Sequence, residues 1–141
     1  MRWLVEQYYQ SSAFMEISDG YRKTRRGILD KFCMEHGHKR YAQIEHRHIK
    51  KICAKMIERP GAANNLLKAL RQVFNHAVDD DLLDTNPAAR VKKLKTKNKN
   101  GFHAWTIEEI EQFESTHPIG TKARLAFALL WYTGQRRSDI V

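Results

Sequence analysis

Apolar residues recur at intervals of three and four along most of the chain, which is the spacing of one face of a helix. No stretch of the sequence alternates apolar and polar residues in the manner of a half-buried strand. The pattern therefore predicts an all-α fold. Helices are expected over residues 3–10, 19–36, 44–59, 64–80, 107–116 and 121–133.

The helix expected over residues 64–80 has the clearest pattern. One face is apolar and should pack in a core; it comprises Leu66, Leu67, Leu70, Val73, Phe74, Ala77 and Val78. The opposite face carries a polar stripe at helical spacing, formed by Asn64, Lys68, Arg71 and Asn75. These residue types read base edges or hold phosphates in a DNA groove, although a solvated helix face also explains the stripe.

Several expected helix ends carry capping residues. Ser18 suits the N-cap of the second helix and Gly37 its end, whereas Pro60 should end the third helix. Thr106 and Glu109 match a capping box at the start of the fifth helix. These signals support the boundaries predicted from the apolar pattern.

One segment divides the chain by its composition. From Arg90 to Ala104 there is no acidic residue, and basic residues occur at nearly alternate positions, so this segment should repel itself and be extended. We interpret residues 90–104 as a basic interdomain linker between a four-helix domain at 1–89 and a second helical region at 105–141. The helix at 121–133 is apolar almost all round and needs neighbours on several sides, so the second domain is expected to be incomplete.

The charge balance narrows the class of partner. The 141 residues include 25 Lys and Arg against 16 Asp and Glu, a net charge of +9. Such an excess favours a polyanion, and nucleic acid is the usual one. The longest apolar run, residues 125–132, is far shorter than the roughly 20 residues of a membrane span, so no membrane association is expected. Because there is no secretory signal and no disulfide framework, we expect a cytoplasmic protein with reduced thiols.

Two basic stretches supply further candidate contacts to double-stranded DNA. The sequence "YRKTRRG" places cations at the start of the second helix, where they suit phosphates; these are Arg22, Lys23, Arg25 and Arg26. The candidates in the linker are Lys92, Lys93 and Lys95. Each phosphate that such a side chain neutralises adds to the salt dependence of binding.

Six cysteine and histidine residues raise the alternative of a zinc site, because clusters of Cys and His can bind zinc. They are Cys33, His36, His38, His46, His48 and Cys53. Their spacing fits no standard zinc finger, and both cysteines fall on apolar helix faces. We therefore expect no metal site and no cofactor.

The sequence "TGQRRSDIV" places two adjacent arginines just beyond the most apolar helix. Gly134 allows the chain to turn sharply out of that helix, and Arg136 can bind a carboxylate or a phosphate through its planar fork. Ser138 and Asp139 suit the start of another helix. The alternative is that the arginines merely compensate the dipole of the helix end.

The stretch "LLWYTGQRRSDIV" resembles the first catalytic box of the tyrosine recombinases, the phage-integrase family, in which an apolar helix precedes Thr-Gly-x-Arg-x-Ser-Glu. The matching positions are Thr133, Gly134, Arg136 and Ser138. Asp139 stands where the family usually has Glu, and Gln135 where an apolar residue is common. Upstream, "LRQVFNHAVDDDLLDTNPA" is similar to the end of the family's helical core-binding domain.

The resemblance implies a four-helix, SAM-like core-binding domain that clamps one side of a duplex, followed by the first helices of a catalytic domain. It implies site-specific integration or excision of DNA through a 3′-phosphotyrosyl intermediate, in which Arg136 is the first of two arginines that stabilise the transition state without a metal. The full-length form would act as a tetramer on two duplexes. The family's hairpin lysine, His-x-x-Arg box and nucleophilic tyrosine all follow the first box, so this chain is not expected to cleave or rejoin DNA alone.

Two alternatives remain open from the residues. The chain could be a stand-alone, non-catalytic helical DNA-binding regulator, or a helical protein-interaction domain whose basic face is simply solvated. A downstream reading frame with a His-x-x-Arg box and a late tyrosine would favour the recombinase, whereas a failure to bind DNA at low salt would favour the interaction domain.

Overall fold

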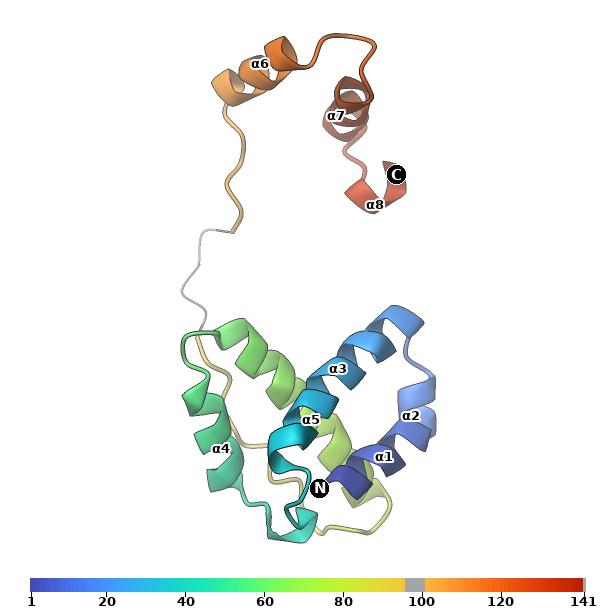
Figure 1. The fold of residues 1–141 in the computed structure, drawn as a ribbon, viewed down its shortest axis with the longest axis vertical. Helices are drawn as coiled ribbons and strands as arrows, with labels where there is room; N and C mark the ends of the chain where they lie inside the picture. The colour runs from blue at the N-terminus through green and yellow to red at the C-terminus, as the bar shows by residue number, and fades with distance from the viewer. Residues whose placement is uncertain (96–100, 141) are drawn as a thin grey trace. The chain divides into compact units, whose positions relative to one another are not determined.

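The computed structural model describes residues 1–95 and 101–140, and every regular element in these ranges is helical. The predicted all-α fold is therefore confirmed. The chain separates into two compact units, which we name unit 1 (Met1–Lys97) and unit 2 (Asn98–Val141) (Figure 1). Residues 96–100 of the predicted linker lie outside the described residues.

Within residues 1–95, unit 1 folds into four longer helices and two short ones. They are α1 (Arg2–Gln10), α2 (Ser12–Met15), α3 (Asp19–His36), the 3-10 helix η1 (Tyr41–Gln43), α4 (His46–Lys55) and α5 (Pro60–Asp79). α5 packs against α1, α3 and α4, so it forms the centre of the unit (Figure 1).

The apolar face predicted for α5 supplies much of the core. Leu67, Leu70, Val73, Phe74 and Ala77 are at most 1% exposed, and only Val78 of the predicted face is half-buried rather than buried. Fully burying a side chain of this kind stabilises the fold by about 1.5–3 kcal/mol relative to leaving it exposed. The helices around α5 cover this face with Leu4, Val5, Tyr8, Phe14, Leu29 and Ile49.

Pro60 begins a helix rather than ending one, so the prediction for this residue is wrong. α4 ends at Lys55, and Pro60 is the first residue of α5, which starts earlier than the Asn64 expected from the apolar pattern. The first helical position tolerates proline because the N–H that proline lacks would have no intrahelical partner there. The sequence pattern missed the first turn of α5 because that turn carries few apolar residues.

The two ends of α3 lie where the sequence predicted them. The backbone N–H of Gly37 donates to the carbonyl of Cys33 at 2.9 Å and closes the helix. Ser18 occupies the N-cap position, but its side chain makes no capping hydrogen bond. The N-cap position of Ser18 was therefore predicted correctly, but the side-chain hydrogen bond that an N-cap serine usually makes is absent.

The chain after α5 turns back along α4 and α5 instead of leaving unit 1 at residue 89 (Figure 1). Asp81 has a positive φ of 57° at the start of this return. Ala88 is fully buried and Val91 is 3% exposed, so both side chains belong to the core. Residues 86–94 are consequently a packed part of unit 1, and not the extended linker expected from residue 90 onward.

Unit 2 contains α6 (Ile107–Thr116), α7 (Lys122–Thr133) and α8 (Arg137–Ile140) in its described residues. The predicted capping box is confirmed, because the hydroxyl of Thr106 accepts from the N–H of Glu109 at 3.3 Å and the Glu109 carboxylate accepts from the N–H of Thr106 at 2.8 Å. Gly134 ends α7 with φ of 62°, a left-handed conformation that glycine adopts without steric cost.

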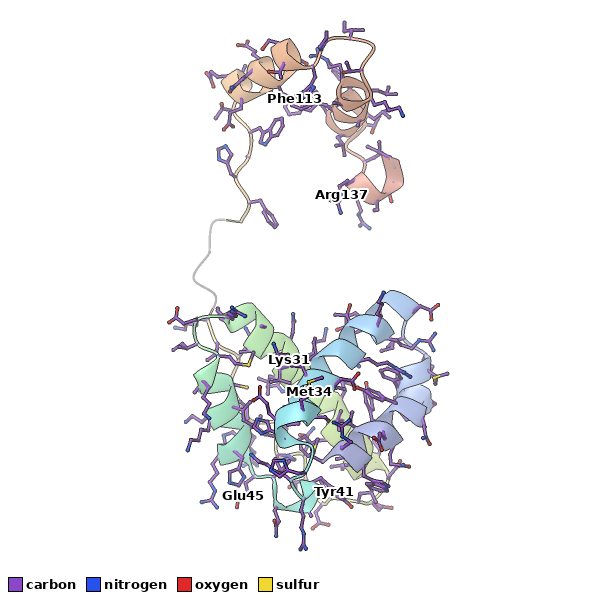
Figure 2. All side chains as sticks on the ribbon, in the orientation of Figure 1. Lys31, Met34, Tyr41, Glu45, Phe113 and Arg137 are labelled. Carbon is purple, nitrogen blue, oxygen red and sulfur yellow. The ribbon has the colours of Figure 1, made fainter. Side chains whose placement is uncertain are left out.

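α6 and α7 meet through a small group of aromatic rings. The ring of Phe113, which is labelled in Figure 2, belongs to this group. It lies 5.0 Å from the ring of Phe127 and 5.6 Å from that of Trp105. No side chain among residues 101–140 is classed as buried, and Leu125 and Trp131 of α7 are 62% and 57% exposed. Within the described residues, the most apolar helix of the chain therefore keeps most of its surface uncovered.

Candidate nucleic-acid interface

The cations at the start of α3 differ in how far they are already engaged. Lys23 is exposed and makes no hydrogen bond or ion pair with any described residue. Arg22 pairs with Asp19, one turn earlier on the same helix. Arg26 is exposed, and its guanidinium lies 4.9 Å from the ring centre of Tyr9. All three can reach solvent, and of these three only Lys23 has no side-chain partner among the described residues.

Arg25 belongs to the core rather than to this basic group. It is 7% exposed, and its guanidinium donates to the hydroxyl of Tyr8 at 2.5 Å and lies over the ring of Tyr21. Burial lowers the pKa of Arg25, but its hydrogen bonds to the two tyrosines outweigh burial and leave that pKa raised. The phosphate contact predicted for Arg25 is not what this geometry favours, because its guanidinium is already engaged by Tyr8 and Tyr21.

Lys68 and Tyr21 meet where α5 crosses α3. The ammonium of Lys68 lies 5.4 Å from the ring centre of Tyr21, and both side chains are exposed. Hydrogen bonding to Lys68, and then to Arg25, lowers the pKa of the Tyr21 phenol. A shallow hollow beside them is also lined by Thr24 and Asn65. This corner of unit 1 thus presents a cation and a polarised phenol together.

Two of the other three members of the polar stripe on α5, Asn64 and Arg71, bind the chain's own backbone. Asn64 donates to the carbonyl of Leu94 at 2.9 Å and accepts from its N–H at 2.8 Å. Arg71 donates to the carbonyls of Ala88 and Val91 at 3.2 Å and 2.6 Å. The DNA contacts predicted for Asn64 and Arg71 are therefore not favoured, because their donors already hold residues 88–94.

Asn75 takes part in the same arrangement through Asn86. The amide of Asn86 donates to the side-chain oxygen of Asn75 at 2.6 Å and to the carbonyl of Arg71 at 3.0 Å. The side-chain oxygen of Asn86 accepts from the N–H of Ala88 at 2.7 Å. We call these hydrogen bonds of Asn64, Arg71, Asn75 and Asn86 the clasp. The clasp explains three of the four residues of the polar stripe on α5, all but Lys68, as a structural feature of unit 1.

The clasp fixes a basic segment beside α4. Arg90, Lys92, Lys93 and Lys95 are all exposed on this segment, and none makes a hydrogen bond or ion pair with a described residue. α4 adds exposed cations that the sequence analysis did not single out, namely Arg47, Lys50, Lys51 and Lys55. Apolar spacing predicted a helix in this region but did not single out these cations, because the proximity of Lys50 to the returning segment depends on tertiary contacts that local spacing does not show.

Arg136 lies in unit 2 between the end of α7 and the start of α8. The left-handed Gly134 redirects the chain there, and the carbonyl of Arg136 accepts from the N–H of Asp139 at 2.9 Å. The Arg136 side chain is exposed and has no partner among the described residues. Arg137 is the first residue of α8 (Figure 2), so this helix begins just before Ser138. An exposed, unpaired guanidinium at this point is free to bind an anion.

The described residues contain no group of three or more potential metal ligands placed to hold an ion. Cys33 and Cys53 are both buried as free thiols, and burial is the main cause that raises the pKa of each. In the same residues, no helix combines the length and apolar character needed to cross a bilayer.

Comparison with known families matches most of unit 1. The family model of the phage integrase central domain matches residues 2–94. This range is more than half of the chain and ends where the clasp ends. The chain therefore belongs to the phage integrase, or tyrosine recombinase, family.

One curated relative extends the similarity beyond unit 1. The ICEBs1 integrase of Bacillus subtilis (strain 168) is 29% identical over 115 residues, which cover 78% of this chain and 31% of the relative. The chain thus spans less than a third of the length of the relative it matches. No solved structure gives a significant match.

Proposed function

We propose that this chain is the DNA-binding portion of a phage-type integrase, a site-specific tyrosine recombinase, and that its partner is double-stranded DNA. The observation that carries the proposal is that the unit matching the integrase central domain exposes cations with no acidic partner. Among the described residues these include Lys23 on α3, Lys68 on α5, and Lys92 and Lys93 after it. Such cations attract the phosphate backbone and supply most of the sequence-independent affinity for DNA.

The proposed DNA contacts are those of the cations predicted from the sequence whose charged groups remain accessible in the structure. They are Arg22, Lys23, Arg26, Lys68, Lys92, Lys93 and Lys95. Phosphate contacts of this kind set the position of a protein on the duplex, whereas base contacts set its specificity. Tyr21, whose ring lies 5.4 Å from the Lys68 ammonium, would donate a hydrogen bond to the same phosphate.

The recombination chemistry is proposed for the full-length protein. Arg136 matches the first arginine of the family's catalytic box and would stabilise the charge that develops on the non-bridging oxygens. A tyrosine beyond this chain would form the 3′-phosphotyrosyl link, which keeps the bond energy available for rejoining. The full-length form would act as a tetramer on two duplexes, and this chain alone would bind DNA without cleaving it.

The first test of the proposal is duplex binding followed by fluorescence anisotropy. The full chain should bind a labelled duplex at low salt, and the double variant Lys23→Gln/Lys68→Gln should bind several-fold more weakly. A matched control, Lys31→Gln/Lys122→Gln, removes the same charge from exposed lysines outside the proposed surface. Equal binding of the two double variants would contradict the assigned contacts.

The second test concerns catalysis. Incubation of the full chain with a nicked duplex should leave no covalent protein–DNA adduct on a denaturing gel. An adduct formed by this chain alone would show that a residue within it acts as the nucleophile.

The alternative function is a stand-alone DNA-binding regulator without catalysis. Both functions require exposed cations on unit 1, so duplex binding does not separate them. A reading frame that continues with a His-x-x-Arg box and a late tyrosine favours the recombinase. A stop codon soon after residue 141, together with specific DNA binding, favours the regulator.

A further inference from the structure

A groove in unit 1 runs between α4 and the segment that follows α5. On the α4 side it is lined by His46 and Lys50, and on the other side by Arg90, Lys92 and Lys93. Each of these five side chains is exposed. Lys50, Arg90, Lys92 and Lys93 have no hydrogen-bond or ion-pair partner within the described part of the chain. The two sides of the groove are therefore lined with accessible cations.

The floor of the groove is apolar. Cys53 and Val91 are each 3% exposed, and Ala54 and the half-buried Leu94 complete the floor. The groove has no acidic side chain in its lining. Reading base edges requires donors and acceptors that such a floor does not offer. Deoxyribose carbons can pack on an apolar floor while the phosphates on either side of them meet cations.

The clasp holds one side of the groove in place. Val91 and Leu94 are fixed through their backbone by Arg71 and Asn64 of α5. The segment that carries Lys92 and Lys93 is thus ordered in the absence of a ligand, so binding does not have to pay the full entropy of ordering it. A basic tail attached to unit 1 without such contacts would lose more freedom on binding.

The groove ends where the charge changes sign. An adjoining hollow shares His46 and Arg90 with the groove, but Glu45, Asp79 and Asp84 also line it. A polyanion that follows Lys93, Lys92 and Lys50 would meet these carboxylates if it continued past Arg90. The carboxylates therefore limit how far along unit 1 a bound strand can extend.

We propose that this groove holds one sugar–phosphate strand of duplex DNA, with phosphates against Lys50, Lys92 and Lys93 and deoxyribose on the apolar floor. The inference rests on the proposed function, and it adds α4 as a contact element and assigns the clasp a positioning role. Because the contacts are to the backbone, they hold the strand without reading its sequence.

The salt dependence of binding tests the cationic sides. For the full chain and a labelled duplex, the double variant Lys50→Gln/Lys93→Gln should lower the magnitude of the slope of log K against log salt by about 2, since each phosphate contact contributes about 0.9. The affinity loss should be the same for duplexes of unrelated sequence. The control Lys51→Gln/Lys31→Gln removes the same charge from exposed lysines that do not line the groove, and it should leave the slope unchanged.

Protection of an introduced thiol tests the floor. Ala54 is exposed and lines the groove, whereas Lys51 is exposed on the same helix outside it, so Ala54→Cys and Lys51→Cys form a matched pair. The native Cys33 and Cys53 are at most 4% exposed and should react slowly. Duplex DNA should slow alkylation of the Ala54→Cys variant several-fold and leave that of the Lys51→Cys variant unchanged.

The outcomes separate this inference from the function on which it rests. The groove assignment is overturned if the chain binds the duplex, both double lysine variants give the same salt slope, and the duplex does not slow alkylation of Ala54→Cys. That result would leave DNA binding by unit 1 intact. Stronger protection by polyglutamate or single-stranded RNA than by the duplex overturns the choice of ligand. No duplex binding by the unsubstituted chain at low salt overturns the proposed function as well.

Discussion

One side chain, Asn64 on α5, satisfies both backbone groups of Leu94. Its amide donates to the Leu94 carbonyl at 2.9 Å, and its oxygen accepts from the Leu94 N–H at 2.8 Å. The two residues are 30 positions apart, so this pairing joins the end of the folded segment to the start of the longest helix. It shows that Asn64, although part of the polar stripe on α5, serves the fold of unit 1.

Replacing Asn64 tests the clasp. The variant Asn64→Ala removes two hydrogen bonds and leaves the backbone groups of Leu94 unpaired, which should lower the free energy of unfolding by about 1–3 kcal/mol. The neighbouring Asn65 is exposed, and its side chain makes no hydrogen bond with a described residue, so Asn65→Ala should change little. Urea denaturation measures both. If the Leu94 amide exchanges its hydrogen faster in Asn64→Ala but not in Asn65→Ala, the loss of stability arises at the Asn64–Leu94 pairing. Unchanged stability and unchanged exchange in Asn64→Ala would contradict the clasp.

The packed segment after α5 shows where the sequence pattern was insufficient. Periodicity predicted the core face of α5 because many large apolar residues repeat there at helical spacing. Residues 86–94 form no helix, so Ala88 and Val91 have no period by which to be recognised as core residues. Their burial depends on hydrogen bonds from Arg71 and Asn64, which lie far away in the sequence. Such contacts cannot be read from local spacing.

Arg25 and Tyr8 should be energetically coupled. Removing the guanidinium in Arg25→Ala leaves a buried phenol without its partner, and Tyr8→Phe leaves a buried cation with one partner fewer. Hydrogen bonds to charged groups contribute about 1.5–3 kcal/mol, so a double-mutant cycle should give a coupling free energy in that range. The adjacent Arg26→Ala, at an exposed position, should show little coupling to Tyr8. A coupling near zero for Arg25 would contradict the buried contact.

Alanine should change stability in opposite directions at two glycines, Gly27 within α3 and Gly37 at its end. A Cβ at Gly37 would come within 2.4 Å of the Cys33 carbonyl, so Gly37→Ala should lower thermal stability. A Cβ at Gly27, within α3, would meet nothing within 4 Å. Gly27→Ala should therefore raise stability by about 0.5–1 kcal/mol, because glycine loses more backbone entropy in a helix. An unchanged or raised melting temperature for Gly37→Ala would contradict the close approach to the Cys33 carbonyl.

The buried thiols should make unit 1 sensitive to alkaline pH. Burial raises the pKa of Cys33 and Cys53 above the ordinary value of 9.0, so the folded state favours the neutral thiols. Their contribution to stability is complete below the pKa of the unfolded chain and is lost as the pH rises through it towards the folded value. The free energy of unfolding should fall above about pH 9, and it should fall less steeply in Cys33→Ala/Cys53→Ala. Equal pH slopes for the two proteins would contradict the shift.

The candidate interface was predicted in part from the basic stretches. Lys23, Lys68, Lys92 and Lys93 are accessible where the sequence placed cations, but whether they bind DNA stays a prediction. Arg25 could have been set aside from the sequence, because it lies four residues before Leu29 and seven before Phe32, on the buried side of α3. The role of Lys50 was not predictable in this way, since it depends on the return of the chain beside α4.

Salt-dependent duplex binding tests the central claim most directly. Titration of the full chain against a labelled duplex over a range of salt concentrations should give binding at low salt. A linear fall of log K with log salt should follow, with a slope of about −0.9 for each phosphate neutralised. Lys68→Gln should reduce the magnitude of that slope by about 1. Absence of binding at low salt, or binding that does not depend on salt, would contradict the assignment of this chain as the DNA-binding portion of an integrase.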